Sequence, residues 1–408
     1  MEIVLKVQTI KTGDATSGPL KQEARAGESR ESFPETKGLK MPDARCLSML
    51  SLCETASGGV GRYQENLLAL ADHGIACRVL LPDADRHILG PEADVLTFHR
   101  ERRGGSALIA FLRAFLAERK RSKPDIYFFN STFSLLPLVV LRLLQDKTPA
   151  IYCAHCWAIA TQDANSWKGH MVRAVEGNLC GLADLVINVA QNDAATARRF
   201  GYRGRQIVVE HAVPAADPQA PDDLFDRAST DETHLLFVGR FDRQKGLDLL
   251  LPAFTRARAQ NPGLHLHLVG GAVRGGDTPE PRDGVTNHGW ANPDQIDSYC
   301  KSADALIVPS RWEAGMPLVV LEALRNGSPV FASSGCATDG FLERNGCGAG
   351  FDLDEDDLSA LLAGLRRPDL AAMRPRALAA FQAHFTLDRF TAEMAQHIRG
   401  LTKGHDND

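Results

Sequence analysis

The chain has 408 residues, 44% of them hydrophobic and 24% charged, and its formal net charge is −5. This length predicts two domains of about 150–200 residues each. The slightly acidic balance gives no support for nucleic-acid binding, which favours a basic domain, so we expect no nucleic-acid partner.

The N-terminal part differs in composition from the rest. Residues 11–40 are rich in Gly, Ser, Thr, Glu and Lys and hold few large apolar side chains, which predicts a disordered extension over residues 1–42. Residues 1–20 have no apolar segment behind a basic start, so we expect no secretory signal. Met41 directly precedes the first strand pattern, so a start at Met41 is an alternative.

Residues 43–213 alternate between short apolar runs and helical patterns. Strands are predicted at 46–52, 76–81, 125–129, 150–153, 184–189 and 207–210, and helices at 62–72, 107–121, 167–181 and 193–200. Apolar strands separated by helices favour a parallel sheet covered on both faces. The longest apolar stretch, residues 133–144, is interrupted by Pro137 and Arg142 and is too short to cross a bilayer. These features predict a cytoplasmic protein.

The alternation then pauses and restarts. Residues 214–232 are rich in Pro, Asp and Ala without periodicity, which predicts a linker. Residues 233–385 predict a second domain, with strands at 234–238, 264–269, 285–288, 305–308 and 329–332 and helices at 247–260, 293–302 and 318–325. Residues 386–408 are expected to form a last helix and tail. The predicted fold class is α/β, with two Rossmann-like doubly wound domains facing each other across a ligand cleft.

Nine cysteines are scattered through apolar segments, which is typical of reduced, buried thiols. Only Cys153 and Cys156 form a C-x-x-C pair. A structural zinc site needs a second pair of ligands, and the sequence offers no good one, so no metal is predicted.

Residues 239–246 follow a strand and open a helix. Backbone N–H groups and the positive helix end are expected to point to the cleft here. Arg240 presents a planar fork for phosphate oxygens, and Lys245 a mobile point charge. The two cations suit a diphosphate, and the alternative is a pair of solvated surface cations.

Residues 309–324 lead from a strand through a turn of small residues into a helix. Pro317 stands at the first helical position, which proline favours, and Glu322 lies one turn into the helix. A carboxylate there can accept two hydroxyl hydrogen bonds, as a ribose diol offers. Its apolar neighbours, Leu321 and Ala323, argue against a merely solvated glutamate.

The turn after the first strand, residues 57–61, reads S-G-G-V-G. Glycines here let a phosphate or sugar approach the backbone closely. The turn lacks the G-x-G-x-x-G spacing of a dinucleotide fingerprint, so it is a weak signal by itself.

His155 follows the strand predicted at 150–153. A lone histidine is usually structural, but the carboxyl end of a first-domain strand faces the cleft. Both roles are open for His155.

These segments resemble the retaining glycosyltransferases of family 4, which have the GT-B fold. Residues 239–246 resemble the family's G-R-x(4)-K-G diphosphate clamp, and residues 309–330 resemble its P-S-x(2)-E-G-F-x-L-V-x-x-E-A-x-x-x-G-x-P-V signature. Ser57-Gly58-Gly59 resembles the glycine loop after its first strand. The likeness runs from about residue 44 to about residue 400.

The resemblance implies that nine residues line a donor site. They are Arg240, Lys245, Gly58 and Gly59 for the donor diphosphate, Leu318 and Val319 for backbone contact near the phosphates, Glu322 for the nucleotide ribose, and His155 and Glu313 for catalysis beside the donor sugar. It also implies a nucleotide-diphosphate sugar as co-substrate, no other cofactor, no required metal, and retention at the anomeric carbon. The final helix would cross back onto the first domain.

Two positions depart from the family pattern. The family's paired glutamates enclose seven residues, whereas Glu313 and Glu322 enclose eight. Either the turn holds one extra residue and Glu313 still reaches the donor sugar, or the position aligned with Ala314 has lost its carboxylate. In addition, His211-Ala212 stands where the family usually has Asn-Gly.

The segment from Arg100 to Lys123 holds eight basic residues against Glu101 and Glu118. The helix expected here is apolar on one side, through Leu108, Phe111, Leu112 and Phe115. A basic amphipathic helix suits peripheral contact with an anionic membrane, here the inner face of the cytoplasmic membrane. The alternative is a core-packed helix with a solvated basic face.

The primary hypothesis is transfer of a hexose from a UDP- or GDP-sugar to a polysaccharide, lipopolysaccharide or lipid-linked saccharide acceptor. One alternative is a sugar-nucleotide 2-epimerase of the same architecture, which would need acid–base carboxylates around the sugar. A second is a degenerate, non-catalytic nucleotide-sugar binder, which the altered glutamate spacing suggests.

Overall fold

The computed structural model describes residues 45–405, except residues 57, 103, 164, 274–275, 314, 337 and 339 and the side chains of residues 161, 404 and 405. The extension predicted over residues 1–42 therefore lies outside the described residues, as do Ser57 and Ala314.

Seven parallel strands form the sheet of the first domain, in the order β3-β2-β1-β4-β5-β6-β7. They are β1 (Leu47–Cys53), β2 (Ile75–Pro82), β3 (Val95–Phe98), β4 (Ile126–Asn130), β5 (Ala150–Cys153), β6 (Leu185–Asn188) and β7 (Gln206–Val208). Every residue of β2, β4, β5 and β6 is buried. Burial on both faces is what parallel sheets covered by helices require.

Helices cover both faces of this sheet. They are α1 (Gly59–Leu68), α2 (Gly105–Ser122), α3 (Leu135–Leu143), α4 (Trp167–Leu179) and α5 (Gln191–Arg199). One face packs against α1 through Tyr63 and Leu67, and the other against α2 and α3 through Phe111, Phe115 and Leu138. The sequence pattern does not predict β3 or α3, because β3 is only partly buried and the apolar residues of α3 show no clear helical stripe.

The second domain repeats this plan with six parallel strands in the order β10-β9-β8-β11-β12-β13. The strands are β8 (Thr233–Val238), β9 (Leu264–Val269), β10 (Val285–Asn287), β11 (Ala305–Val308), β12 (Val330–Ser333) and β13 (Gly348–Phe351). The helices are α6 (Leu247–Gln260), α7 (Ile296–Ser302), α8 (Leu318–Arg325), α9 (Phe341–Arg344), α10 (Glu355–Gly364) and α11 (Arg367–His384). The α/β fold class with two Rossmann-like domains is confirmed.

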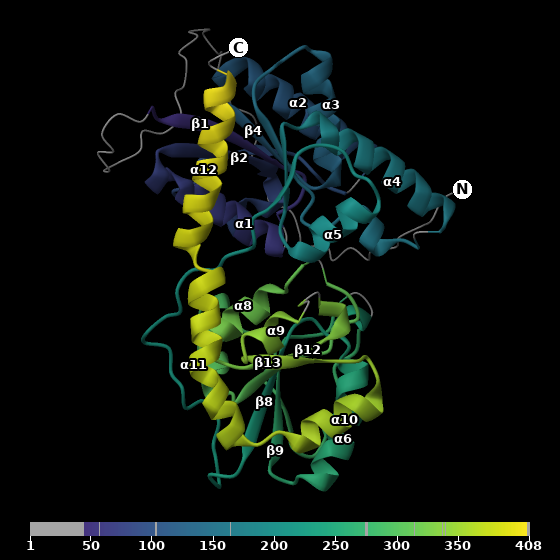
Figure 1. The fold of residues 1–408 in the computed structure, drawn as a ribbon, viewed down its shortest axis with the longest axis vertical. Helices are drawn as coiled ribbons and strands as arrows, with labels where there is room; N and C mark the ends of the chain where they lie inside the picture. Colours follow the sequence, from purple (N-terminus) through teal and green to yellow (C-terminus); the bar gives the residue numbers. More distant parts are fainter. Residues whose placement is uncertain are drawn as a thin grey trace, which may run out of the picture.

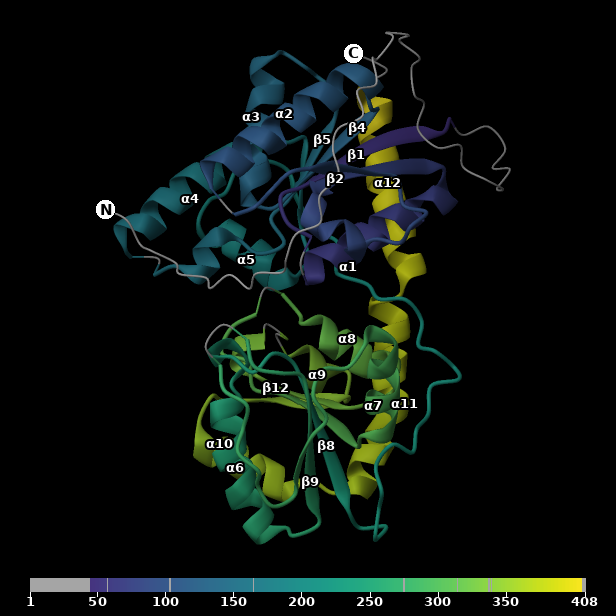
Figure 2. The ribbon, with the colours of Figure 1, turned by 180° about the vertical axis from the view of Figure 1, so that it is seen from behind.

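The last helix, α12 (Leu387–His405), returns to the first domain. Phe390, Met394 and Ile398 belong to the core that α1 shares with the first sheet. Arg399 donates to the backbone carbonyl of His73 at 2.6 Å. Figures 1 and 2 show α11 and α12, in yellow, running along one side of both domains. The expected crossing of the final helix is confirmed.

Residues 214–232 connect the two sheets without a helix or strand and pack on the second domain. Phe225 is buried in a core of that domain, and Arg227 donates to Asp304 at 2.9 Å. Among the described residues, no helix is both long enough and apolar enough to pass through a membrane.

The strand orders fix where each domain can hold a ligand. In each sheet the order reverses between the first strand and the fourth, that is, between β1 and β4 and between β8 and β11. Open α/β sheets bind ligands at this switch point, outside the carboxyl ends of the strands. Figure 1 shows the carboxyl end of β8 directed towards the first domain.

Candidate functional site

The loop that leaves β8 fixes the backbone of Lys245. The Asp242 carboxylate caps the short turn at Arg243–Lys245 by accepting from the Lys245 backbone N–H at 3.2 Å. Gly246 has a φ of +70°, and a side chain on it would collide with the Pro309 carbonyl oxygen. Only glycine fits here without strain, and α6 then begins at Leu247.

Arg240 lies on the same loop, with its side chain 39% exposed. Its Nε lies 3.0 Å from Asp242 Oδ2, and Nη2 donates to Gln244 Oε1 at 3.1 Å. These partners hold the guanidinium at the rim while leaving part of its fork open to a ligand.

Lys245 and Glu313 meet at the switch point of the second domain. Lys245 Nζ lies 2.5 Å from Glu313 Oε1, and the two side chains are only 18% and 10% exposed. Gln244 Nε2 donates to the Trp312 carbonyl at 3.0 Å, which ties the two loops together. The structure therefore brings a predicted diphosphate-binding cation and a predicted catalytic carboxylate into direct contact.

Glu322 lies on α8, which begins at Leu318 directly after Pro317. Burial raises the pKa of its carboxyl, while the positive charges of Arg325 and Arg62 lower it. Arg62 belongs to α1 of the first domain, so Glu322 stands on the side of α8 that faces that domain. Among the described residues, nothing donates a hydrogen bond to this carboxylate, which suits it to accept from a ligand.

The glycine turn of the first domain faces the start of α8. Gly58 has a φ of +71° and precedes α1. A β-carbon placed on Gly59 would lie 3.7 Å from Leu318 Cδ1. Two helix N-termini thus meet across the interface, and both carry partial positive charge and free N–H groups. This arrangement favours an anion between the domains. Leu318 and Val319 form the first turn of α8.

His155 follows β5 with a φ of +60°, a left-handed conformation that is uncommon outside glycine. Its Nε2 lies 2.9 Å from Asn130 Oδ1. The Asn130 amide donates to Ser51 Oγ and to the Leu52 carbonyl, so Oδ1 accepts and the His155 proton sits on Nε2. Burial, helped by nearby His211, lowers the pKa of His155 to about 3, which keeps the ring neutral.

A small cavity of about 60 Å³ lies between the domains, beside His211. Its lining comes from both domains: Val189, Ala190, Gln191, Glu210, His211, Met316, Leu321, Thr338, Phe341, Arg344 and Phe385. Burial lowers the pKa of His211 to about 4. The sequence does not point to Thr338 or Arg344 as cleft residues, because neither belongs to a recognisable motif.

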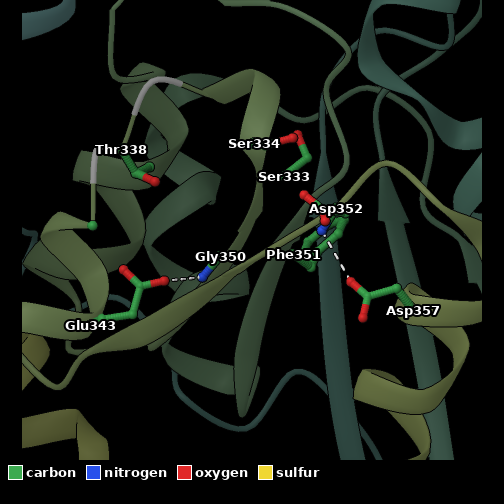
Figure 3. Close-up of a pocket in the computed structure, with 9 residues that line it drawn as sticks. Ser333, Ser334, Thr338, Glu343, Gly350, Phe351, Asp352 and Asp357 are labelled. Atoms are coloured by element: carbon green, nitrogen blue, oxygen red, sulfur yellow. Dashed lines mark hydrogen bonds between the residues drawn. The ribbon is translucent and has the colours of Figure 1, made fainter.

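A larger hollow, about 450 Å³, lies at the carboxyl ends of β12 and β13 and is drawn in Figure 3. Glu343, Asp352 and Asp357 give it an acidic lining. The Asp357 carboxylate accepts from the Asp352 backbone N–H at 3.0 Å, and Glu343 accepts from that of Gly350. Three carboxylates repel a diphosphate, so this hollow is less suited to the donor phosphates than the switch point.

Cys153 is buried and Cys156 half-buried. Burial raises the pKa of both thiols to about 12. Within the part of the chain that the structure describes, no group of three metal-binding side chains includes either cysteine.

The fold and the site together define a class: two-domain α/β proteins with an anion-binding edge on each side of the interface. Two family models match the chain, "Glycosyltransferase Family 4" over residues 57–215 and "Glycosyl transferases group 1" over residues 232–367. Between them they take in most of both domains. The chain belongs to the group 1, family 4 glycosyltransferases.

Several curated proteins are similar to this chain. An uncharacterised 41.2 kDa protein in the cps region of Klebsiella pneumoniae is 26% identical over 71% of this chain and 81% of its own length. Two others match shorter parts. A Salmonella typhimurium lipopolysaccharide 1,2-N-acetylglucosaminetransferase is 34% identical over 25% of this chain and 30% of its own length. A Segniliparus rotundus D-inositol 3-phosphate glycosyltransferase is 35% identical over 47% of each chain.

Solved structures share the fold. Sucrose-phosphate synthase from Thermosynechococcus elongatus superposes with a TM-score of 0.69 at 21% identity, covering 88% of this chain and 100% of that one. Anabaena HepE in complex with UDP-glucose gives 0.69 at 16% identity, covering 87% and 100%. These likenesses confirm the GT-B architecture. The nine site assignments stay predictions.

Proposed function

We propose that the protein is a retaining hexosyltransferase that uses a nucleotide-diphosphate sugar as donor and a polysaccharide, lipopolysaccharide or lipid-linked saccharide as acceptor. One observation carries this proposal. Arg240 and Lys245 lie on the loop that leaves β8 at the edge of the second domain that faces the first. Glu322 lies on α8, whose N-terminus meets that of α1 across the interface. That edge offers cations and N–H groups to a diphosphate and a carboxylate to a ribose.

The chemistry follows from where charge develops. When the bond between the sugar and the diphosphate breaks, the leaving group gains negative charge. Lys245, Arg240 and the two helix ends stabilise that charge in a partly buried site, which lowers the barrier to transfer. These groups supply the electrostatic stabilisation that a metal provides elsewhere, so we propose transfer without a metal and without a further cofactor.

Glu313 and His155 are the proposed catalytic residues beside the donor sugar. A bound diphosphate would compete with Glu313 for Lys245, and this exchange would free the carboxylate to act on the sugar. His155, neutral at physiological pH, would contribute as a hydrogen-bonding group rather than as a cation. The acceptor class draws support from the names of relatives, such as the Salmonella lipopolysaccharide transferase.

A panel of labelled UDP- and GDP-hexoses, each incubated with the protein in the presence and absence of EDTA, tests the proposal. We expect slow hydrolysis of one donor, unaffected by EDTA. NMR should show that the released sugar keeps the anomeric configuration that it had in the donor. Formation of an epimer would instead support the 2-epimerase, and tight binding without turnover would support the non-catalytic binder.

We also propose peripheral contact with an anionic membrane through Arg100–Lys123, at the inner face of the cytoplasmic membrane. The apolar face of α2 is not available for this, because Phe111 and Phe115 are buried in the core. Arg100 is not available for membrane contact either, because its side chain forms an ion pair with Glu54 at 2.9 Å. The contact would therefore rest on the exposed cations Arg113, Lys120, Arg121 and Lys123.

Co-sedimentation with vesicles of phosphatidylglycerol or phosphatidylcholine tests the membrane contact. The triple variant Arg113→Gln/Lys120→Gln/Lys123→Gln should lose binding to the anionic vesicles. The matched control carries the same charge loss on exposed residues of the second domain, Arg256→Gln/Arg282→Gln/Arg376→Gln. Equal binding by both variants would refute the proposed surface.

A further inference from the structure

Three side chains that can bind a metal meet at the end of the second domain remote from the cleft. Glu232 ends the connecting segment, and His234 and His265 are paired across β8 and β9. His234 Nε2 lies 3.5 Å from Glu232 Oε2, and His265 Nε2 lies 3.7 Å from Glu232 Oε1. The potential ligand atoms all lie within 4.8 Å of one another.

The His234 ring is buried with one nitrogen unsatisfied. Its side chain is 2% exposed, and Nε2 has no hydrogen-bond partner among the described residues. Buried polar atoms are nearly always partnered, so an unpartnered ring nitrogen beside a carboxylate is a candidate metal ligand. Glu232 and His265 are 16% and 30% exposed, which leaves an entry path from solvent.

A chain of histidines fixes which His234 nitrogen is available. His234 Nδ1 lies 2.9 Å from His267 Nε2, and His267 Nδ1 lies 3.0 Å from His288 Nε2. Phe225 stacks on His267 with ring centroids 3.6 Å apart, which holds the chain in place. If each Nδ1–H donates along the chain, the lone pair of His234 Nε2 points to Glu232. Metal-bound histidines are oriented by such outer hydrogen bonds.

We infer that Glu232, His234 and His265 form a structural site for a divalent cation of the zinc type. Two imidazoles and a carboxylate are ligands that zinc accepts, with water in the fourth position. Zinc–ligand distances of about 2.0–2.1 Å place tetrahedral ligands about 3.3 Å apart. The separations of 3.5 Å to Glu232 Oε2 and 3.7 Å to Glu232 Oε1 are close to this value. The His234 and His265 rings are nearly parallel, at 16°, so the more exposed His265 ring must tilt to bind.

Such a site would join the end of the connecting segment to β8 and β9. His234 lies five positions before Gly239 along an extended strand, or roughly 16 to 17 Å from the cleft edge at about 3.3 Å per residue. The bound cation would therefore stabilise the second domain without touching the donor, and the inference is independent of the proposed function.

Titration of the untagged full chain with Co²⁺ and Zn²⁺ tests the inference. We expect one tight equivalent of either metal, a rise in Tm on binding, and visible Co²⁺ bands without a thiolate charge-transfer band. His265→Ala and Glu232→Gln should each weaken binding by at least about 100-fold, since even outer partners of metal ligands are worth about 10–100-fold.

The control is His170→Ala, on the exposed face of α4, which should bind the metal as the unchanged chain does. Circular dichroism of each metal-free variant verifies its fold, and His265 is preferred to buried His234 for this reason. The site would be overturned by unchanged metal affinity in both His265→Ala and Glu232→Gln. A thiolate charge-transfer band in the Co²⁺ spectrum, or binding of less than one equivalent of metal, would also overturn it.

Discussion

The two domains share one strand order but bring different chemistry to their common interface. The second domain contributes side chains that can carry charge: Lys245 and Glu313 on two loops, and Glu322 on α8. The first contributes a glycine turn at Gly58 and the half-buried His155, whose ring is neutral. A parallel doubly wound sheet therefore dictates where a ligand sits but not which charges meet it.

The difference suggests a division of labour. A charged diphosphate needs cations in fixed positions. In the second domain, Asp242 and Gly246 fix the backbone of the loop that carries Lys245. Beside the proposed sugar position the first domain offers the glycine turn and the neutral ring of His155, and its charged Arg62 lies near Glu322 instead. If this division is correct, charge-removing substitutions on the second domain should have larger effects than changes on the first.

The largest effect is expected for Glu313→Gln. Loss of a positioned acid–base or charge-stabilising group costs about 10²–10⁴-fold in kcat. Nucleoside diphosphate affinity should stay equal or improve, because Lys245 loses its competitor at 2.5 Å. Steady-state kinetics and calorimetric titration measure the two quantities.

The matched control for Glu313→Gln is Glu355→Gln, at the exposed start of α10, which should behave like the unchanged protein. If the turnover of Glu313→Gln equals that of the control, Glu313 does not act on the donor sugar. The family's first glutamate would then align with Ala314, where the carboxylate has been lost.

Lys245→Ala comes next. It removes charge-assisted contacts to the diphosphate worth about 1.5–3 kcal/mol, or roughly 10- to 150-fold in kcat/KM. It also leaves Glu313 buried without its partner, so the folded state should lose some stability. Exposed Lys168→Ala on α4 is the control, and an unchanged kcat/KM in Lys245→Ala would remove Lys245 from the site.

The sequence predicts the fold class, the order of most elements and the crossing of the final helix. It does so because apolar runs and helical periods are local signals. β3 and β13 are as long as several predicted strands, but each is only partly buried and two of the four residues of β13 are glycines, so neither gives a clear apolar signal. Phe225 shows a different limit of sequence prediction. Its segment has the composition of a linker, yet its side chain is buried in a core of the second domain.

Contacts between distant segments are the part of the site that sequence reasoning does not reach. Lys245 and Glu313 each belong to a recognisable motif, but their pairing depends on β8 and β11 lying side by side. The approach of Gly59 to Leu318 likewise requires the two domains to be docked. His234 and His265 carry no motif at all, and only the strand register brings them together.

A smaller effect is expected for Glu322→Gln, on the side of α8 that faces the first domain. The amide keeps one acceptor and loses the charge, so nucleoside diphosphate affinity should fall about tenfold. Because burial raises the pKa of Glu322, the folded state disfavours the carboxylate. The variant should therefore have a higher Tm above the raised pKa, and this gain should vanish as the pH falls and Glu322 is protonated. A lower Tm at neutral pH would contradict this account.

The smallest effect on activity is expected for His211, in the first domain, although its effect on stability depends on pH. Burial lowers the pKa of His211 to about 4, below the ordinary histidine value of about 6.5. Between these two pH values the unfolded chain binds a proton that the folded chain does not. His211 therefore costs the folded state about 1.4 kcal/mol per pH unit as the pH falls through this window, and nothing more below about pH 4.

His211→Asn restores the residue that the family usually has at this position, and it should flatten the dependence of Tm on pH between about 6.5 and 4. At neutral pH both proteins should transfer sugar at similar rates, because the cations and carboxylates of the second domain are unchanged. His170→Asn, exposed on α4, controls for the loss of a histidine. Parallel Tm curves for His211→Asn and the unchanged chain would show that protonation of His211 is not coupled to folding. A large loss of activity at neutral pH would instead show that His211 contributes to transfer directly.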